Sequence, residues 1–485
     1  LSLIVIDLAP QIVTPVQMPP GIVSGDYNFQ IPVNASSNRT PASYAATGLP
    51  TGLSINTVTG EISGKPKVSK GTPYSVVLTA TNAKGKSTAT ASLLVSPLPS
   101  GTVGVFNGLV HRQPGISGGS QGGRLDLTTT ATGQFSGKLT LGTAMHNFTG
   151  VLNAEVGVDS PTGLVAILRT ANTTLTLNFS IDRSQHRLSA AMITDGVQQA
   201  TITGWRNLWS TAIPATEYAG YYTLGLEIPV DKMDDEAIPQ GQGFASFTVA
   251  NAGTMIVAGK LADGTAFSTS GTLGPLGELM VYQTVSTSTD SVLGLLTIDV
   301  GTEGVFDDST LTGSLSWSRE VQALAERVYQ AGFAPFELTA VGGRYVAPSA
   351  SAIVMELLDN DDNAILDFAG AGVGTTESPV SPGLTLRIRA AGVVNLPASN
   401  PRSTSLTVTP SSGMFNGGFT LIDPNPAVPA TNATRSATYQ GMIVRHAGGL
   451  SGFGFFLLQK LPAALPETVD TTPKLSGQVV LEPAF

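Results

Sequence analysis

The chain has 485 residues, of which 41% are hydrophobic and only 12% charged, and it contains 55 glycines, 31 prolines and no cysteine. This length predicts two to four domains, and the lack of cysteine excludes disulfides, thiolate zinc sites, iron–sulfur clusters and cysteine nucleophiles. The net charge is −9, with +3 on residues 1–97 and −12 on the remainder, which argues against nucleic acid or an anionic membrane as partner.

The first predicted element is a single β-sandwich over residues 1–97. Apolar and polar residues alternate from Tyr74 to Ala80 and again from Ala89 to Val95, on either side of a turn at 82–86. A period of two places one set of side chains on one face of a strand. The sequence therefore predicts a closing β-hairpin with one face toward the core.

Two motifs upstream of this hairpin identify a family. Residues 48–53 read Gly-Leu-Pro-Thr-Gly-Leu, and residues 59–66 read Thr-Gly-Glu-Ile-Ser-Gly-Lys-Pro. Together with the hairpin they resemble the immunoglobulin-like, cadherin-related modules that recur in tandem in bacterial surface proteins. The resemblance implies a spacer or adhesive module and no catalyst. Some relatives bind calcium between modules through acidic clusters, but Asp7, Asp26 and Glu61 are far apart in sequence, so no metal site is carried over.

Two further β regions follow a linker at 96–101. Residues 102–210 predict an antiparallel barrel or meander, with the clearest alternation in the run 174–181. Residues 213–485 predict a larger antiparallel β domain, interrupted near 320–330 by one short helix because Val321, Leu324, Ala325 and Val328 have helical spacing. The fold class expected is all-β: an Ig-like sandwich followed by two related antiparallel barrels or sandwiches with that helix.

A repeated phrase links the two regions. It occurs at Gly137–Ala144, at Gly259–Ala266 and more loosely at Gly417–Leu421, and each copy predicts a strand that runs into a turn. The repeat favours duplication of a β unit. The Gly-Lys-Leu-Ala-Asp-Gly-Thr turn at 259–265 and the Gly-Phe-Phe-Leu strand at 454–457 carry a second resemblance. Through them residues 102–485 resemble the carboxy-terminal β-repeat regions of very large secreted bacterial proteins, a resemblance that implies no activity.

The candidate metal ligands lie in an acidic run. They are Asp359, Asp361, Asp362 and Asp367. Their carboxylates are hard oxygen ligands suited to Ca²⁺, but Ala364 stands where a calcium loop has glycine and Gly370 where it has a closing glutamate. A solvated turn is the alternative, and no other cofactor is predicted.

Other reactive patterns are less specific. A second acidic loop has no ligand pattern and contains Asp231, Asp234, Asp235 and Glu236. Four histidines lack the close spacing of a zinc site and are expected at the surface; they are His111, His146, His186 and His446. The stretch Gly115–Gly119 matches Gly-x-Ser-x-Gly, but strands follow it where a nucleophile elbow needs a helix. No catalytic residue is therefore assigned.

The leading hypothesis is a non-enzymatic, structural or adhesive protein, extracellular or on the bacterial cell surface, and the carboxy-terminal part of a larger secreted polypeptide. Its expected partners are surface polysaccharide or envelope proteins, with self-association through sheet edges also open. One alternative is a polysaccharide-acting enzyme with two carboxylates in an aromatic-walled cleft. Another is an outer-membrane barrel, suggested by the terminal Phe485 and the strand-rich composition but opposed by Pro483 and by only 6% aromatic residues. No transmembrane helix is expected, because no long apolar run occurs.

Overall fold

Nearly all of the chain is β-structure, as its alternating apolar residues predict. The computed structural model describes residues 7–34, 36–170, 172–285, 290–323, 325–376 and 378–484. One compact unit takes most of residues 7–206 and the other most of residues 207–485. The first unit holds an Ig-like module and one eight-stranded sheet, and the second unit holds two more eight-stranded sheets.

The Ig-like module is built from two three-stranded sheets and one parallel pair. One sheet has the order β2-β5-β4, the other β3-β6-β7, and β1 pairs with β8. The strands are β1 (Gly21–Ile22), β2 (Tyr27–Gln30), β3 (Ser43–Thr47), β4 (Leu53–Ile55), β5 (Glu61–Gly64), β6 (Tyr74–Asn82), β7 (Gly85–Leu93) and β8 (Val95–Ser96). Ile62, Val76 and Leu78 are fully buried between the sheets. The predicted closing hairpin is confirmed as β6 and β7, which pair antiparallel with Asn82 opposite Gly85.

Two glycines of the family motifs are required by close backbone contacts. Gly52 and Gly64 have φ of +100° and +128°, in the region that favours glycine. A Cβ on Gly52 would lie 2.0 Å from the Lys65 carbonyl oxygen, and a Cβ on Gly64 would lie 2.3 Å from that of Gly52. The motif spacing therefore reflects two backbone segments that pass too closely for any side chain.

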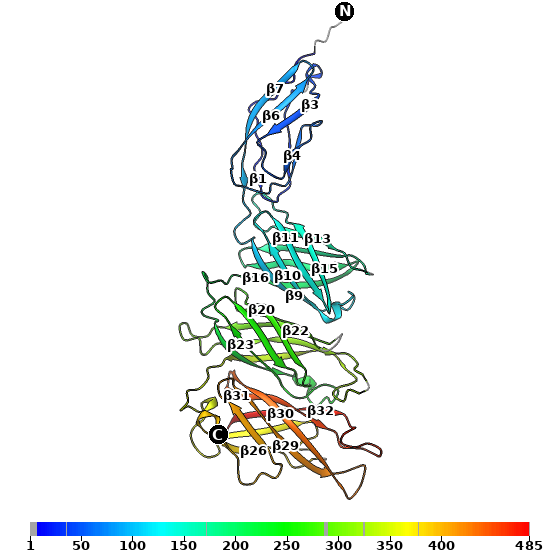
Figure 1. The fold of residues 1–485 in the computed structure, drawn as a ribbon, viewed down its shortest axis with the longest axis vertical. Helices are drawn as coiled ribbons and strands as arrows, with labels where there is room; N and C mark the ends of the chain where they lie inside the picture. The colour runs from blue at the N-terminus through cyan, green and yellow to red at the C-terminus, as the bar shows by residue number, and fades with distance from the viewer. Residues whose placement is uncertain are drawn as a thin grey trace, which may run out of the picture. The chain divides into compact units, whose positions relative to one another are not determined.

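The first eight-stranded sheet is an up-and-down meander whose first and last strands pair. Its order is β12-β11-β10-β9-β16-β15-β14-β13, and Gly108 of β9 lies opposite Gly204 of β16. The strands, labelled in part in Figure 1, are β9 (Gly104–Val110), β10 (Gly123–Thr129), β11 (Gln134–Leu141), β12 (Ala144–Val151), β13 (Thr162–Ile167), β14 (Leu175–Asp182), β15 (Arg187–Asp195) and β16 (Gln198–Arg206). A bridge between Asn153 and Thr162 brings the two outer edges together, so the sheet is barrel-like.

The second sheet repeats this order as β20-β19-β18-β17-β24-β23-β22-β21, and the third has the order β27-β26-β25-β32-β31-β30-β29-β28. The second comprises β17 (Gly220–Glu227), β18 (Gly243–Val249), β19 (Thr254–Lys260), β20 (Ala266–Thr272), β21 (Glu278–Val285), β22 (Asp290–Asp299), β23 (Thr310–Arg319) and β24 (Phe333–Arg344). The third comprises β25 (Ala364–Gly370), β26 (Leu384–Ile388), β27 (Val394–Asn395), β28 (Ser405–Thr409), β29 (Met414–Pro424), β30 (Asn432–His446), β31 (Gly449–Gln459) and β32 (Lys474–Pro483). Each of the three sheets is an up-and-down meander whose last strand pairs with its first. The two edge strands, which do not pair among the described residues, are the fourth and fifth in the first two sheets and the third and fourth in the last. The predicted region 213–485 thus contains two such sheets, where the sequence indicated one larger domain.

Side chains fill the interiors of the barrel-like sheets, as expected for eight strands. Phe135 and Phe179 pack edge to face in the first, with ring centroids 5.3 Å apart. Tyr222 stacks on Phe247 at 5.2 Å in the second. Phe368 contacts Phe419, Tyr439 and Phe456 in the third.

The repeated phrase does not occupy equivalent places in all three sheets. Its first two copies run from the third strand (β11 or β19) through a turn into the fourth, as predicted. The third copy, Gly417–Leu421, lies wholly inside β29, which is the fifth strand, so the prediction of a turn is wrong there. The repeated phrase forms a glycine-containing strand in each sheet. The residues that follow the phrase determine where that strand ends.

The helix predicted near 320–330 is wrong, because the described residues 320–323 and 325–330 form an irregular segment; Leu324 lies outside the described residues. Backbone contacts with the third sheet take the place of helical hydrogen bonds: Lys474 N donates to Arg327 O at 2.8 Å, and Val328 forms a parallel bridge with Lys474. The segment is not helical, although its apolar residues have helical spacing, because it pairs with Lys474 instead. In the described residues the helical elements are 3-10 turns of three residues, at Ser37–Arg39, Gly119–Gln121, Val230–Lys232, Val354–Glu356 and Ala390–Gly392. The terminal Phe485, on which the outer-membrane alternative depends, also lies outside the described residues.

Candidate functional site

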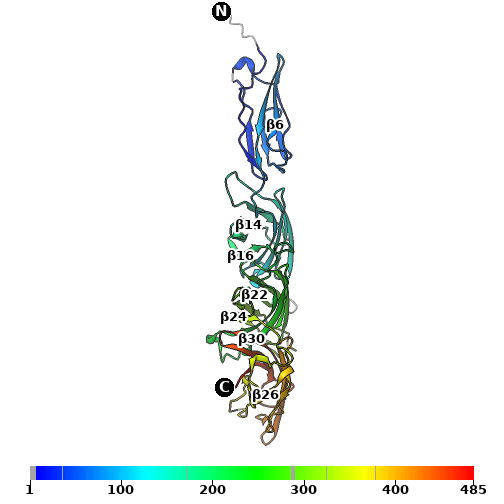
Figure 2. The same ribbon diagram turned by 90° about the vertical axis from the view of Figure 1, so that its left-hand side faces the viewer.

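The second and third sheets share an apolar seam within the second unit. We define the seam by five buried residues: Phe244, Ala262, Met442, Val444 and Phe455. Phe244 of β18 stacks on Phe455 of β31 with ring centroids 6.1 Å apart. Strands β24 and β30 also lie side by side here (Figure 2). The seam joins the two sheets with the same apolar packing that fills a domain core.

Ser476 of β32 is the hydrogen-bond centre of the seam. Its Oγ donates to Ala262 O at 2.6 Å and accepts from Gly241 N at 3.1 Å, and its own backbone N donates to the Tyr329 hydroxyl at 2.9 Å. Ser476 is fully buried, and burial also raises the pKa of Tyr329 above its ordinary value. These bonds fix three chain segments of the second sheet against one strand of the third.

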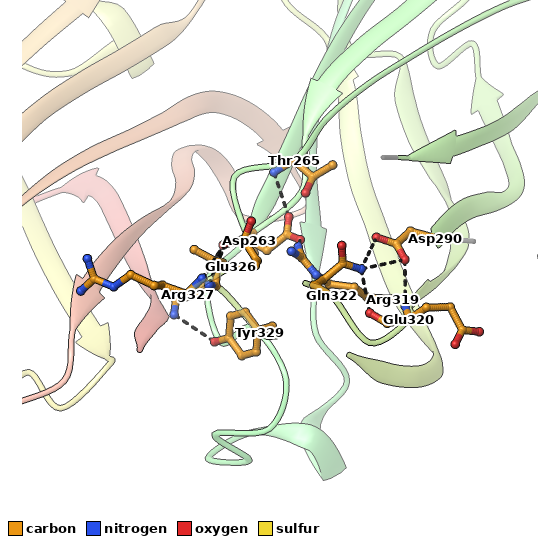
Figure 3. Close-up of polar contacts among 12 residues, drawn as sticks. Asp263, Thr265, Asp290, Arg319, Glu320, Gln322, Glu326, Arg327 and Tyr329 are labelled. Atoms are coloured by element: carbon orange, nitrogen blue, oxygen red, sulfur yellow. Dashed lines mark hydrogen bonds and ion pairs between the residues drawn. The ribbon is translucent and has the colours of Figure 1, made fainter. Parts of the chain in front are cut away.

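A buried ion pair stands next to this centre (Figure 3). Asp263, in the turn of the second repeated phrase, pairs with Arg319 at the end of β23, and both side chains are buried. Asp263 Oδ1 also accepts from Thr265 N at 2.9 Å. A buried carboxylate needs such partners, because transfer of an unpaired charge out of water is costly. The pair therefore joins the turn after β19 to the end of β23 and has a structural role.

A second polar cluster in the same view surrounds Asp290. Its Oδ1 accepts from Glu320 N at 2.8 Å, and the Gln322 side-chain amide donates to both carboxylate oxygens at 3.2–3.3 Å (Figure 3). These bonds fasten the start of the irregular segment 320–330 to β22. They explain further why that segment does not coil into a helix.

A cavity of about 400 Å³ opens beside the seam. Its polar lining comes from the end of β17, the loop after it, and β32: Glu227, Asp234, Gln240, Gln242 and Gln478. Burial raises the pKa of Glu227, and nearby His446 partly opposes this shift. The Oε1 atom of Gln242 is buried without a hydrogen-bond partner. The cavity therefore gathers a carboxyl group that ionises less readily than usual and, at Gln242, an amide oxygen with unused bonding capacity.

The predicted calcium residues are only partly brought together. Arg387 on β26 pairs with Asp361 at 2.6 Å and with Asp359 at 2.9 Å, whereas Asp367 lies on β25 with its side chain exposed. Asp362 occupies the turn before β25 with φ +58°. Over the described ranges no group of three or more histidine, aspartate or glutamate side chains is placed to hold a metal ion. Calcium binding by this run remains a prediction, and two of its four carboxylates face a guanidinium.

The second acidic loop, by contrast, borders the cavity. Asp234 lines it, Asp235 Oδ1 accepts from Ala237 N at 2.9 Å, and Glu236 pairs with Lys460 at 2.9 Å. The side-chain amide of Gln240 donates to the carbonyls of Lys232 and Asp235 and closes the loop. Asp231 lies in the 3-10 turn Val230–Lys232.

The remaining candidate patterns have ordinary structural surroundings. The stretch Gly115–Gly119 is a turn between β9 and β10, followed by a single 3-10 turn and not by the helix of a nucleophile elbow. His111 and His446 hydrogen-bond the hydroxyls of Thr203 and Ser451 at 2.8 and 3.0 Å.

Sequence reasoning missed the residues that line the cavity, apart from Asp234. Glu227 had a weak signal, since it is a single acid directly after the apolar run Tyr221–Leu226. Gln242 and Gln478 had none, because glutamine in a polar turn or on a strand is unremarkable in sequence. Only the packing of β32 against the loop after β17 brings them together.

Comparisons with known proteins bear mainly on the first module. Residues 9–96 match the family model "Putative Ig domain", which confirms the Ig-like module and indicates a surface or structural role. No curated protein matched the chain. In the described residues no helix has the length and apolarity needed to span a membrane.

Solved structures give short or distant likenesses. A "putative alpha-galactosidase" of Bacteroides fragilis NCTC 9343 is 29% identical over 20% of this chain and 19% of its own, with a TM-score of 0.17. A "putative alpha-galactosidase/melibiase" of the same organism is 32% identical over 19% and 18%, also with a TM-score of 0.17. The chain thus spans about a fifth of either protein. The eight N-terminal Ig domains of Down Syndrome Cell Adhesion Molecule are 10% identical over 98% of this chain and 72% of theirs, with a TM-score of 0.15.

Proposed function

We propose that the chain is a non-catalytic portion of an extracellular or cell-surface protein, in which its β modules form a structural and adhesive framework. The observation that carries this proposal is the filled interior of all three eight-stranded sheets, beside an Ig-like module. A barrel whose interior is packed with aromatic side chains provides rigidity and leaves its outer surface for contacts. The buried bonds of the seam extend this rigidity from the second sheet to the third.

Two measurements test this proposal. Antibodies against the purified chain should label intact cells of the producing organism, and the purified chain should release no reducing ends or peptides from envelope polysaccharide and protein. Labelling only after cell lysis would contradict the surface location. Turnover by the purified chain would contradict the non-catalytic role.

A polysaccharide-acting enzyme is the second candidate, because the cavity places Glu227 and Asp234 in one lining. Glycoside hydrolysis uses two carboxyl groups, one of which has a raised pKa, as burial provides at Glu227. In the described part of the chain, no aromatic side chain of the kind expected in a sugar subsite lines this cavity. If the chain does release reducing ends, Glu227→Gln should abolish that activity and Glu337→Gln, on the exposed face of β24, should not.

A further inference from the structure

The cavity beside the seam has two chemically different walls. Glu227, Gln242 and Gln478 provide carboxyl and amide groups, while Ile228, Val230 and Met233 provide apolar surface. Its volume of about 400 Å³ lies within the range of small-molecule sites, in which apolar contact is combined with a few placed polar groups.

The backbone that carries Gln242 is held by contacts with the third sheet, so this part of the polar wall is formed before any ligand binds. Gln242 N donates to Gly454 O at 3.1 Å, and Gly241 N donates to Ser476 Oγ at 3.1 Å. A Cβ on Gly241 would lie 2.5 Å from Phe455 Cβ, so this stretch is pressed against the third sheet. Preorganised groups bind a ligand at a lower cost in conformational entropy.

The charge of the lining selects among ligands. No lysine, arginine or histidine is among the described residues that line the cavity, which disfavours an anion. The lining holds two carboxyl groups, Glu227 and Asp234, and burial works against ionisation of Glu227, which weakens the attraction of the site for a cation. Amide and carboxyl groups both accept hydrogen bonds, and amides also donate, which matches hydroxyl groups that do both. The unpartnered Gln242 Oε1 can turn about its soft terminal torsion to accept from such a hydroxyl.

We propose that this cavity binds a neutral saccharide of mono- or disaccharide size, with Gln242 and Gln478 hydrogen-bonding its hydroxyls and Ile228, Val230 and Met233 contacting its C–H groups. The site would supply the adhesive part of the function proposed above, on which this inference rests. Binding here involves no turnover, so it differs from the enzyme candidate.

The test is titration calorimetry of the full chain with four neutral disaccharides: lactose, maltose, cellobiose and N,N'-diacetylchitobiose. At least one should bind saturably, with a Kd of about 1 mM or below, the range of a few hydrogen bonds plus apolar contact. Gln478→Leu should weaken that binding about tenfold or more, the equivalent of one lost hydrogen bond. Gln242→Leu should do the same while leaving thermal unfolding unchanged, because the amide oxygen that it removes has no partner in the protein.

Control variants and charged probes distinguish saccharide binding in this cavity from binding elsewhere and from binding of ions. Gln199→Leu, an exposed glutamine on β16, should bind as the unmodified chain does. Glu227→Gln should weaken binding less than Gln478→Leu does, because a neutral ligand does not depend on the charge. The proposal is overturned if none of the four disaccharides binds, if both Gln242→Leu and Gln478→Leu bind normally, or if spermidine or citrate binds in preference and loses binding in these variants. If no saccharide binds, but antibodies label intact cells and the chain shows no turnover, the cavity proposal is wrong and the proposed framework function is still supported.

Discussion

The turns at 141–144 and 263–266 have nearly the same sequence, but one buries a leucine and the other an aspartate. Leu141 is 1% exposed and Asp263 5% exposed, and both directly precede the Gly-Thr-Ala of the repeated phrase. Asp263 is matched by Arg319, whereas Leu141 needs no partner because it is apolar. Glycine and threonine therefore define the turn, while the neighbour that packs against it determines which side chain the turn can bury.

Removing the ion pair between Asp263 and Arg319 should lower the stability of the protein more than any other change considered below. Arg319→Met leaves the Asp263 carboxylate buried without its partner, and we expect the free energy of unfolding to fall by about 3–5 kcal/mol. Urea unfolding followed by the fluorescence of Trp317, buried inside the second sheet, measures this loss. The double variant Asp263→Leu/Arg319→Met imitates the first turn and should recover most of the stability. A double variant as unstable as Arg319→Met would refute this account.

The hydroxyl beside the turn should have the next largest effect. Ser476→Ala removes a donor to Ala262 O and an acceptor for Gly241 N, both inside the seam, and should cost about 1–3 kcal/mol. Ser314→Ala, on the exposed side of β23, serves as control and should change stability by less than about 0.5 kcal/mol. Equal urea midpoints for the two variants would show that Ser476 does not hold the seam.

A half-buried carboxyl group should have a smaller, pH-dependent effect. Because burial raises the pKa of folded Glu227 above its unfolded value, the folded protein binds this proton more tightly, and stability falls as pH rises from the unfolded pKa of about 4 through the higher folded pKa. Glu227→Gln should therefore raise the Tm relative to the unmodified chain at pH 7, and the difference should vanish toward pH 4. Glu337→Gln, on an exposed position, should show no such pH dependence. Scanning calorimetry across this pH range decides the matter, and a difference that grows at acid pH would have the wrong sign.

The exposed ion pairs of Arg387 should make the smallest contribution to the stability of the protein. Solvent and salt screen the attraction between Arg387 and the carboxylates of Asp359 and Asp361, so Arg387→Ala should leave the Tm unchanged within error. Removal of the guanidinium frees both carboxylates, and Ca²⁺ should then raise the Tm of Arg387→Ala more than that of the unmodified chain. Addition of EDTA should reverse the rise. An equal calcium response in both proteins would show that Arg387 does not compete with a cation.

Several features of the fold were predictable because they are local. Gly52 and Gly64 are required by close backbone contacts, and the alternation of Val76, Leu78 and Ala80 follows from the period of a strand. The segment 320–330 was not predictable, since its apolar spacing suits a helix while Arg327 and Val328 pair with a strand almost 150 positions away. The division of residues 213–485 into two sheets was also hidden, because the third sheet places the repeated phrase in a different strand.

Composition, the period of two and the turn residues act over a few positions, so the sequence alone predicts glycine-punctuated antiparallel strands, an Ig-like module, and no cysteine chemistry within these 485 residues. Tertiary packing pairs the last strand of each long meander with its first, places Arg319 against Asp263, and brings Glu227, Gln242 and Gln478 into one cavity. These contacts join residues far apart in the chain, and burial of apolar surface between whole sheets, which no local pattern encodes, brings them together.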